Sequence, residues 1–263
     1  MSRHTPLRRR TKLAVSGTVA EWIEDPRRPG AWILEVGGAE QSTLVPGNPR
    51  ALVYEYLQRI APAIDAVGET GAPLHVLHLG GGALSLPRYV QATRPGSRQL
   101  VIDLDAELMP FVLESFPLEA PGLTSIVIGD VREALPSPGT QDPYDVVILD
   151  ISLGPGSPER LLETDFYREL LALLAPEGTL LINVGDEQPL NITRRIAAQL
   201  SALGTSVWVS AHQGIADGRY HGNLILGASR RRWPRERLDG LRAAGPHPAA
   251  VLVGIELEGL GKP

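Results

Sequence analysis

The sequence predicts an α/β protein: a doubly wound, mostly parallel seven-stranded sheet with a small antiparallel β domain on its N-terminal side. Two observations carry this prediction. From residue 74 onward, short apolar runs alternate with segments whose apolar residues recur at helical spacing, which is typical of a parallel sheet covered on both faces. Residues 13–45 instead show strand-like alternation, interrupted by a turn cluster at 25–30.

The chain divides into four expected segments. Residues 1–12 form a basic tail, 13–47 the small β domain, 48–230 the main Rossmann-like domain and 231–263 a C-terminal extension. The apolar spacing after Asn48, with Pro49 suited to a first helical turn, predicts that the main domain begins with a helix. Pro and Gly are frequent in the extension, so the pattern leaves its secondary structure open.

The main domain is expected to alternate strands and helices along the chain. Buried strands are expected at 74–80, 98–105, 123–130, 144–150 and 178–184, and helices at 86–93, 106–116, 165–175 and 191–203. Residues 205–211 and 222–229 then close the sheet as an antiparallel pair. Ligands of such sheets bind beyond the carboxyl ends of the strands, so functional residues are expected there.

Composition excludes several classes of protein. The formal net charge of −5 argues against nucleic-acid binding, and we interpret the basic runs at 8–10 and 230–232 as a solvated tail and a solvated loop. No apolar run approaches the roughly 20 residues that span a bilayer, and no apolar core follows the N-terminal basic residues. The chain has no cysteine and therefore no disulfides. We expect a cytoplasmic protein without membrane or nucleic-acid partners.

Glycines end the first strand of the main domain. Gly80, Gly81 and Gly82 allow a tight turn and the close approach of a ligand to main-chain N–H groups, although glycines also end strands for packing reasons alone. The turn lacks the full G-x-G-x-x-G spacing, which disfavours a nicotinamide dinucleotide.

Acidic residues end the next two strands. Asp103, 23 residues after Gly80, is placed to accept hydrogen bonds from ribose hydroxyls, the alternative being a surface acid. Asp130 is placed to accept from the exocyclic amine of adenine, to cap the segment beginning at Val131, or both. Leu104 and Val131, which follow these two acids, complete the expected nucleoside contacts.

Two further acids follow the fourth and fifth strands. Asp150 is placed for proton abstraction or cation stabilisation, the alternative being a cap or turn residue. Ser152 opens a loop that could fold over the site, and Asp186 is either a fourth acid of the cleft or a solvated loop acid. Together the four acids predict a pocket for a ligand rich in hydroxyls and amines, such as an adenosyl sulfonium. The histidines show no metal-ligand spacing, so no metal is expected.

The segments VLHLGGG, VIDLD, IVIGD and YDVVILDIS, with DFY before the 165–175 helix, resemble the spermidine synthase family of polyamine aminopropyltransferases, over roughly residues 40–230. The resemblance implies the class I methyltransferase fold, S-adenosylmethionine or its decarboxylated form as cofactor, a small-molecule amine acceptor, and a homo-oligomer such as a dimer, since members of the family are commonly dimers or tetramers. Asp103 then matches the acid at the ribose, Asp130 the acid at the adenine and Asp150 the acid that helps to deprotonate the attacking amine.

The resemblance also assigns residues nearer the N-terminus. Gln41 matches a cofactor-contacting glutamine of the small domain. The segment VYEYL resembles a substrate-binding helix of the family, with Glu55 at its Glu and Tyr54 where a His is expected.

Two departures from the family pattern bear on the ligands. Ala83 stands where an acid helps to hold the cofactor's primary amine, and Leu153 where an acid helps to hold the polyamine. Each cation of a diamine needs a partner once desolvated, so these departures argue against putrescine as the acceptor. Loss of the acid at position 83 also removes a reason to reject intact S-adenosylmethionine. Three functions stay open: aminopropyl transfer to an amine, methyl transfer on the same scaffold, and non-catalytic nucleoside binding.

Overall fold

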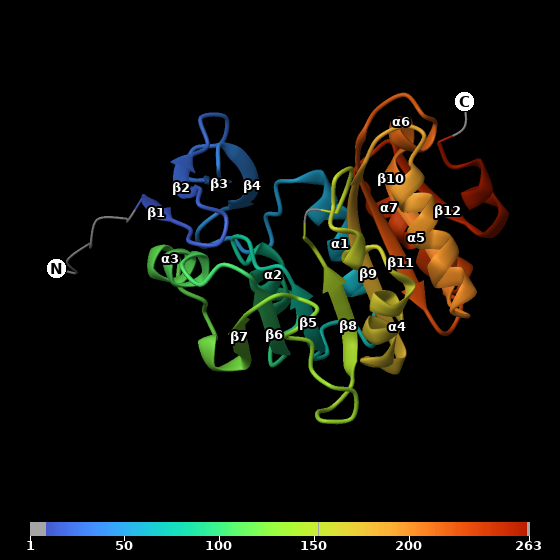
Figure 1. Cartoon of the computed structure of the whole chain (residues 1–263), viewed down its shortest axis with the longest axis horizontal. Coiled ribbons are helices and arrows are strands. Elements are labelled where there is room, and N and C mark those ends of the chain that lie inside the picture. Colours follow the sequence, from blue (N-terminus) through green and yellow to red (C-terminus); the bar gives the residue numbers. More distant parts are fainter. Residues whose placement is uncertain (1–8, 152, 262–263) are drawn as a thin grey trace.

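The computed structural model describes residues 9–151 and 153–261, and these build two sheets (Figure 1). The smaller sheet is antiparallel, in the order β1-β2-β3-β4. Its strands are β1 (Arg10–Lys12), β2 (Val19–Glu24), β3 (Trp32–Val36) and β4 (Ala39–Leu44). The last three residues of the expected tail therefore form a strand, because their backbone groups pair with β2.

The larger sheet has the strand order β12-β10-β11-β9-β8-β5-β6-β7. Its parallel strands are β5 (His75–Leu79), β6 (Arg98–Asp103), β7 (Thr124–Ile128), β8 (Tyr144–Leu149) and β9 (Leu174–Asp186). Strands β10 (Ser206–His212) and β11 (Gly222–Ser229) form the predicted antiparallel pair. The predicted fold class is confirmed, with one strand more than expected: β12 (Ala249–Val253), from the C-terminal extension, pairs with β10.

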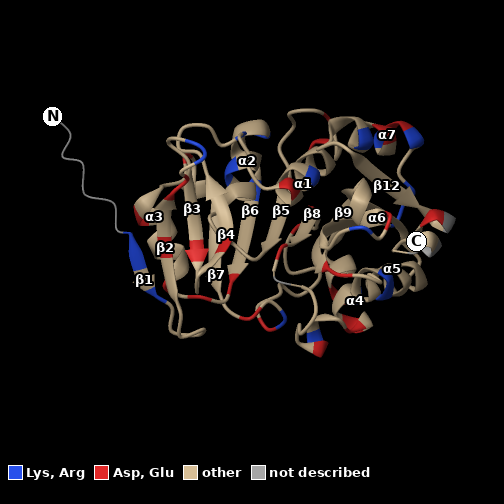
Figure 2. Ribbon diagram, turned by 90° about the horizontal axis from the view of Figure 1, so that it is seen from above, with Lys and Arg blue, Asp and Glu red and all other residues tan. Residues whose placement is uncertain are grey.

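Helices cover both faces of the larger sheet, as Figure 2 shows from above. On one face lie α1 (Glu55–Asp65), α2 (Ser85–Thr93) and α7 (Arg235–Ala244), and on the other α4 (Thr164–Ala172) and α5 (Asn191–Ala202). Alternate residues of each strand supply the two faces: Val76 packs under the first group, whereas Leu77 and Leu79 pack under the second. The short α6 (Gln213–Ala216) and the 3₁₀ turns η1 (Pro121–Leu123), η2 (Glu159–Leu161) and η3 (Gly254–Gly259) lie in connections.

The small sheet packs against α3 (Leu108–Ser115) and the residues around it (Figure 1). The indole of Trp22 is buried there, with its ring centroid 4.9 Å from that of Phe116 in an edge-on arrangement. Aromatic pairs of this geometry stabilise a contact beyond the apolar area that they bury. The small sheet is thereby held beside the carboxyl ends of the parallel strands.

The first helix of the main domain begins later than predicted. Helix α1 starts at Glu55 rather than near Pro49, and Tyr54 is extended, with φ −75° and ψ 139°. The side-chain amide of Gln58 donates to the carbonyl oxygens of Leu52 and Val53. These carbonyl groups would accept main-chain hydrogen bonds if the helix began one turn earlier. The later start decides which aromatic side chain faces the site. Over the ranges 9–151 and 153–261, no helix is both long and apolar enough to cross a membrane.

The junction of β10 and β11 provides a test of packing. Gly227 pairs directly with Trp208, and a Cβ at position 227 would stand 2.0 Å from the buried indole. Gly227→Ala is expected to lower the free energy of unfolding by about 2–4 kcal/mol, because the ring must shift in a closely packed core. Gly240→Ala in α7, where a Cβ meets nothing within 4 Å, is the control and should stabilise by about 0.5–1 kcal/mol. Equal effects of the two changes in urea unfolding would contradict this packing.

Candidate active site

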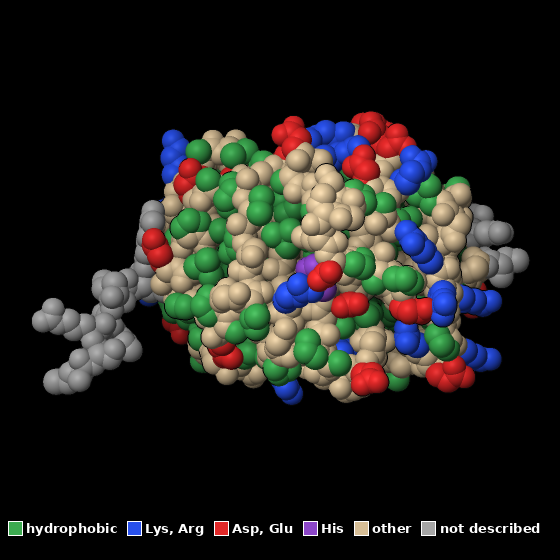
Figure 3. Space-filling view, turned by 90° about the horizontal axis from the view of Figure 1, so that it is seen from below, with side chains coloured by type: hydrophobic (Ala, Val, Ile, Leu, Met, Phe, Trp, Pro, Cys, Tyr) green, Lys and Arg blue, Asp and Glu red, His purple; other side chains and the backbone are tan. Residues whose placement is uncertain are grey.

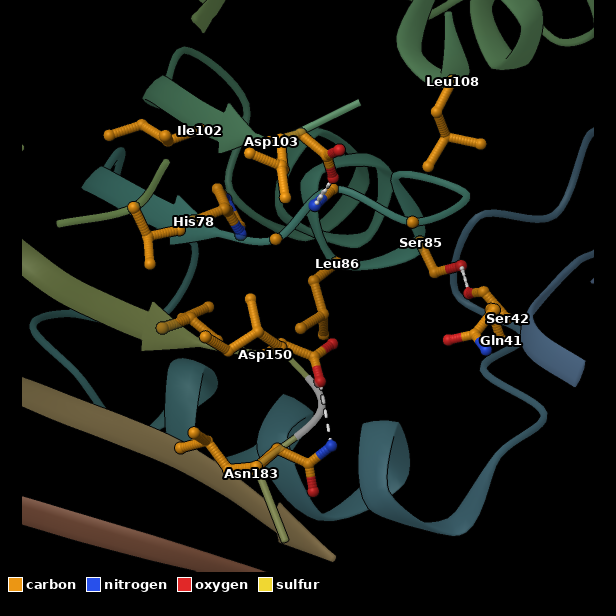
Figure 4. Close-up of a pocket in the computed structure, with 18 of the residues that line it drawn as sticks. Gln41, Ser42, His78, Ser85, Leu86, Ile102, Asp103, Leu108, Asp150 and Asn183 are labelled. Carbon is orange, nitrogen blue, oxygen red and sulfur yellow. Dashed lines mark hydrogen bonds between the residues drawn. The ribbon is translucent and has the colours of Figure 1, made fainter. Parts of the chain in front are cut away.

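A cavity of about 680 Å³ lies over the carboxyl ends of β5, β6, β8 and β9. Residues of the small sheet, among them Gln41 and Ser42, line its opposite wall (Figure 4). Its volume lies within the range of small-molecule sites. On the underside of the molecule, Figure 3 shows charged side chains gathered mostly over the half away from the small sheet.

The register of the parallel strands aligns residues at their carboxyl ends, and these residues form one side of the cavity. Leu79 pairs with Ile102 on one side and with Leu149 on the other, and Leu149 pairs with Ile182. The next residue of each strand therefore falls in line, which gives the row Asp103, Gly80, Asp150, Asn183. Strand register thus brings together groups that are far apart in the sequence.

Gly80 must be a glycine because two strand ends touch at this point. Its φ is +99°, and a Cβ there would lie 2.3 Å from the carbonyl oxygen of Asp150. A Cβ at Gly81 would lie 2.8 Å from the sulfur of Met109. The packing explanation therefore holds for Gly80 and Gly81, and all three glycines also line the cavity.

Main-chain N–H groups hold the side chain of Asp103 at one edge of the cavity. Gly81 N donates to Oδ2 at 2.7 Å and Asp105 N donates to Oδ1 at 3.1 Å. Asp105, which the sequence reasoning missed, lines the same edge, and its buried Oδ1 has no hydrogen-bond partner in the described chain. Burial, together with the charges of Asp103 and Glu107, raises the pKa of Asp105. Two carboxylates that only accept hydrogen bonds suit a diol, which has two O–H donors.

Asp130 also lines the cavity, but it is already paired. Arg160 of η2 donates two hydrogen bonds to its carboxylate, at 2.8 and 2.6 Å, and Arg132 N donates a third at 3.0 Å. The Arg160 hydrogen bond is the main cause that holds the pKa of Asp130 below its usual value. The turn-capping interpretation is thus present in the structure, and an adenine amine at this position would share the carboxylate with Arg160. The buried Val131 and the exposed Leu104 line the cavity nearby.

Asp150 and Asn183 meet at the other end of the cavity from Asp103 (Figure 4). Asn183 Nδ2 donates to Asp150 Oδ1 at 2.9 Å. Burial raises the pKa of Asp150 to about 6, and the Asn183 hydrogen bond opposes this shift by favouring the charged form. Tyr56 lines the same region, and its pKa is raised first by burial and then by the charge of Asp150. A carboxylate whose pKa lies near neutral pH is suited to accept a proton.

Three predicted residues do not reach the cavity. Asp186 is buried because its carboxylate accepts hydrogen bonds from Thr193 N and Oγ1, both at 2.8 Å, and so caps the first turn of α5; the prediction of a fourth cleft acid is wrong. Tyr54 donates to Glu40 at 2.8 Å, and Glu55 pairs with Arg59. Because α1 begins at Glu55, it is Tyr56 that faces the cavity. Ser152 lies outside the described residues.

Sequence reasoning missed several polar residues of the lining. They are Glu40, Ser42, Tyr56, Ser85, Asp105, Arg160, Asn183 and Asn223. Asn183 had a usable signal, since it is a polar residue inside the apolar run 180–184, whereas Arg160 had none. His78 packs within its strand, 2.8 Å from Gln99 Oε1, and burial lowers its pKa to about 4, so that it is neutral at pH 7. Within 9–151 and 153–261, no three His, Asp or Glu side chains gather as a metal site would require.

No known family model matches the chain. The solved structure of a probable spermidine synthase from Corynebacterium glutamicum ATCC 13032 superposes with a TM-score of 0.85 and 27% identity, over 98% of this chain and 95% of that one. The chain is similar to spermidine synthases in sequence and in fold. A polyamine aminopropyltransferase of Synechococcus sp. (strain JA-2-3B'a(2-13)) is 28% identical over 190 residues, which are 66% of this chain and 60% of that protein. The alignment therefore spans about three fifths of that relative.

The fold of this spermidine synthase-like chain is shared with methyltransferases. The structure of human methyltransferase-like protein 13 in complex with SAH superposes with a TM-score of 0.55 and 19% identity, over 73% of this chain and 90% of that one. These relatives are transferases. An S-adenosylmethionine-related group fits the residues present. The Oδ1 of Asp105, which has no partner among residues 9–151 and 153–261, and the carboxylate of Asp103 suit a ribose, and the glycine turn leaves room beside them.

The raised pKa of Asp150 predicts a pH-dependent stability. Because the folded-state pKa lies above the unfolded value of 3.8, the buried charge opposes folding, and the loss of stability develops as the pH rises through about 6. Asp150→Asn is therefore expected to be more stable than the wild type at pH 8, by at most about 3 kcal/mol, with the difference shrinking towards pH 4. Urea unfolding at both pH values measures it. Asp165→Asn, on the exposed side of α4, controls for loss of a charge, and a destabilised Asp150→Asn at pH 8 would refute the prediction.

Proposed function

We propose that this enzyme transfers an aminopropyl group from decarboxylated S-adenosylmethionine to an amine acceptor. The observation that carries the proposal is the row Asp103, Gly80, Asp150, Asn183 along one cavity, because it provides acceptors for a ribose at one end and a base at the other. The distance along this row is set by strands that pack about 5 Å apart. A nucleoside therefore fits between the two carboxylates with its reacting carbon near Asp150.

In this proposal the residues that line the cavity divide the work of holding the donor and activating the acceptor. Asp103 and Asp105 accept hydrogen bonds from the ribose hydroxyls, and Asp130 accepts from the adenine amine, with Leu104 and Val131 against the ring. Gln41 contacts the donor from the small sheet. When bound, the donor supplies an electrophilic carbon next to a cationic sulfur. Asp150 accepts the proton of the attacking amine, and the fixed geometry supplies much of the rate.

Methyl transfer from intact S-adenosylmethionine is the second candidate, and one observation favours it. Ala83 is fully buried and Leu153 nearly so, and neither presents a charge to the cavity. At position 83, therefore, no acid repels the carboxylate of intact S-adenosylmethionine. A non-catalytic nucleoside-binding protein is the third candidate, and the presence of Asp150 at the reacting end argues against it.

The wider setting follows from the relatives and the composition. We propose a cytoplasmic homodimer that acts in polyamine-type metabolism on a small-molecule amine other than putrescine, without nucleic-acid or membrane partners. The net charge of −5 supports the absence of nucleic acid. In this proposal residues 48–230 form the catalytic domain and 13–47 the wall that covers the donor.

Identification of the nucleoside product separates the three candidates. The protein is incubated with S-adenosylmethionine or with its decarboxylated form, together with a panel of amines. Mass spectrometry then identifies the nucleoside product. Methylthioadenosine supports aminopropyl transfer, whereas S-adenosylhomocysteine supports methyl transfer. Binding of a donor without either product supports the non-catalytic protein. Asp150→Asn should abolish turnover in either enzyme while leaving donor binding within about threefold of the wild type.

Donor binding should depend on the carboxylate of Asp103. Asp103→Asn removes a charged acceptor from the ribose hydroxyls, so calorimetry should show methylthioadenosine bound about 10–100-fold more weakly. Asp142→Asn is the control, because Asp142 is an exposed acid that pairs with Arg98 away from the cavity. Unchanged affinity in a well-folded Asp103→Asn protein would place the ribose elsewhere.

A further inference from the structure

A β-bulge in the small sheet sets the position of Gln41. Leu34 of β3 pairs with Ser42 and its neighbour Glu35 pairs with Glu40, so two residues of β3 face three residues of β4. Gln41 is the extra residue, and the register of β3 with β4 gives it no partner. A bulge bends its strand and redirects the side chain of the extra residue, and bulges are frequent beside active sites. The bulge therefore marks Gln41 as a residue whose direction matters to the site.

The side-chain amide of Gln41 is free for a ligand. Gln41 is exposed, it lines the cavity, and Figure 4 shows it on the wall that faces Asp150. Within residues 9–151 and 153–261 this amide has no hydrogen-bond partner, whereas the main-chain carbonyl oxygen of Gln41 accepts from the hydroxyl of Tyr56 at 3.4 Å. A side-chain amide offers both donors and an acceptor. What Gln41 can bind therefore depends on where the bulge directs it.

A chain of two buried hydroxyl groups fixes the residues that follow Gln41. Ser85 Oγ, at the start of α2, donates to the carbonyl oxygen of Thr43 at 3.1 Å, because a carbonyl oxygen can only accept. A serine hydroxyl has one proton, so in the 2.9 Å contact between Ser42 Oγ and Ser85 Oγ the donor must be Ser42 (Figure 4). Both side chains are buried, with 5% of Ser42 and 6% of Ser85 exposed. Ser85 therefore joins α2 to two consecutive residues of β4.

Tyrosines at the start of α1 hold the other side of the bulge. Tyr54 donates to the carboxylate of Glu40 at 2.8 Å, and Tyr56 makes the longer contact with Gln41. Burial, followed by the charge of Asp150, raises the pKa of Tyr56, so its hydroxyl keeps its proton for donation. Among the described residues, β4 is an edge strand that pairs only with β3. Hydrogen bonds from the main domain therefore replace the second neighbour that an inner strand would have.

From these contacts we infer that Ser85 is a positioning residue for the donor: through Ser42 and Thr43 it fixes the bulge that directs the side-chain amide of Gln41 into the cavity. The inference rests on the proposed transferase function and adds a residue that acts on the donor through another residue. A group that is held in place before the ligand arrives loses less conformational entropy on binding, so a fixed Gln41 binds the donor more tightly. The packing of Trp22 places the small sheet as a whole, whereas the two hydroxyl groups fix the segment beside the donor.

Direct contact between Ser85 and the donor is the competing explanation, because Ser85 also lines the cavity. Its hydroxyl already donates to Thr43 and accepts from Ser42, which leaves one lone pair for any further contact. The two explanations differ in how the effect of Ser85 depends on Gln41. If Ser85 acts through Gln41, removing the Gln41 side chain also removes the effect of Ser85, whereas a direct contact adds to that of Gln41. A double-mutant cycle therefore separates them.

Calorimetry with decarboxylated S-adenosylmethionine, without an acceptor, measures the cycle. The proteins compared are the wild type, Gln41→Ala, Ser85→Ala and the double variant. Each single change is expected to weaken donor binding by about three- to tenfold, which is the loss of roughly one neutral hydrogen bond. The double variant should bind within about twofold of Gln41→Ala alone. Additive losses in the double variant, or wild-type affinity in either single variant, overturn the inference. Failure of the wild type to bind this donor at all refutes the proposed function instead.

Ser229→Ala is the matched control for loss of a buried hydroxyl. Only 3% of Ser229 is exposed, its Oγ donates to the carbonyl oxygen of Arg231 at 2.7 Å, and it lies outside the cavity. This variant loses a hydrogen bond of the same kind as Ser85→Ala, but it should bind the donor as the wild type does. A loss of donor affinity as large as that of Ser85→Ala would trace the effect to general stability and overturn the inference.

Ser42→Ala keeps the test decisive if Ser85→Ala fails to fold. It removes one hydrogen bond of the chain and leaves the bond from Ser85 to Thr43 in place. Donor affinity is therefore expected to fall by about two- to threefold, less than in Ser85→Ala, and to fall no further when Ser42→Ala is combined with Gln41→Ala. Wild-type affinity in Ser42→Ala, or an additive loss with Gln41→Ala, overturns the inference.

Discussion

Contact between the backbones of two neighbouring strand ends determines the geometry of this site. The carbonyl oxygen of Asp150 occupies the space where a side chain on residue 80 would stand, so β5 must turn at a glycine beside the end of β8. The same register places Asp103 on one side of the turn and Asp150 with Asn183 on the other. The two ends of the cavity are therefore separated by the spacing of strands, which is fixed by backbone hydrogen bonds.

Acidic side chains at one edge of a sheet repel one another unless each has its own partner. In this protein the partners differ, and so do the consequences. Main-chain N–H groups orient Asp103, a guanidinium pairs with Asp130, and a single neutral amide holds Asp150. The pKa of Asp150 is raised to about 6, because burial there is opposed by one neutral hydrogen bond. In the proposed function, these different partners are what make Asp150 a base and leave Asp103 and Asp130 as binding groups on the same sheet edge.

The small sheet contributes to the site by enclosing it. Its packing through Trp22 against Phe111 and Phe116 holds β3 and β4 over the carboxyl ends of the parallel strands. The hydroxyl groups of Ser42 and Ser85 lie 2.9 Å apart and join this wall to the start of α2. Enclosure lowers the local dielectric, which strengthens the electrostatic effects of the buried acids. The antiparallel domain is thus part of the site as well as an addition to the fold.

The sequence by itself determined the fold class, the glycine turn and the positions of Asp103, Asp130 and Asp150, because each depends on a local pattern: an apolar run followed by glycine or an acid. Tertiary structure decided which of these groups face one cavity. Asn183 meets Asp150 through the register of β8 with β9, Arg160 reaches Asp130 from a distant turn, and Asp186 is withdrawn to cap α5. Local sequence patterns also did not predict the eighth strand or the late start of α1. The strand depends on its pairing with β10, and the start of α1 depends on side-chain hydrogen bonds of Gln58. Periodicity specifies what each segment forms, whereas register and packing specify which segments meet.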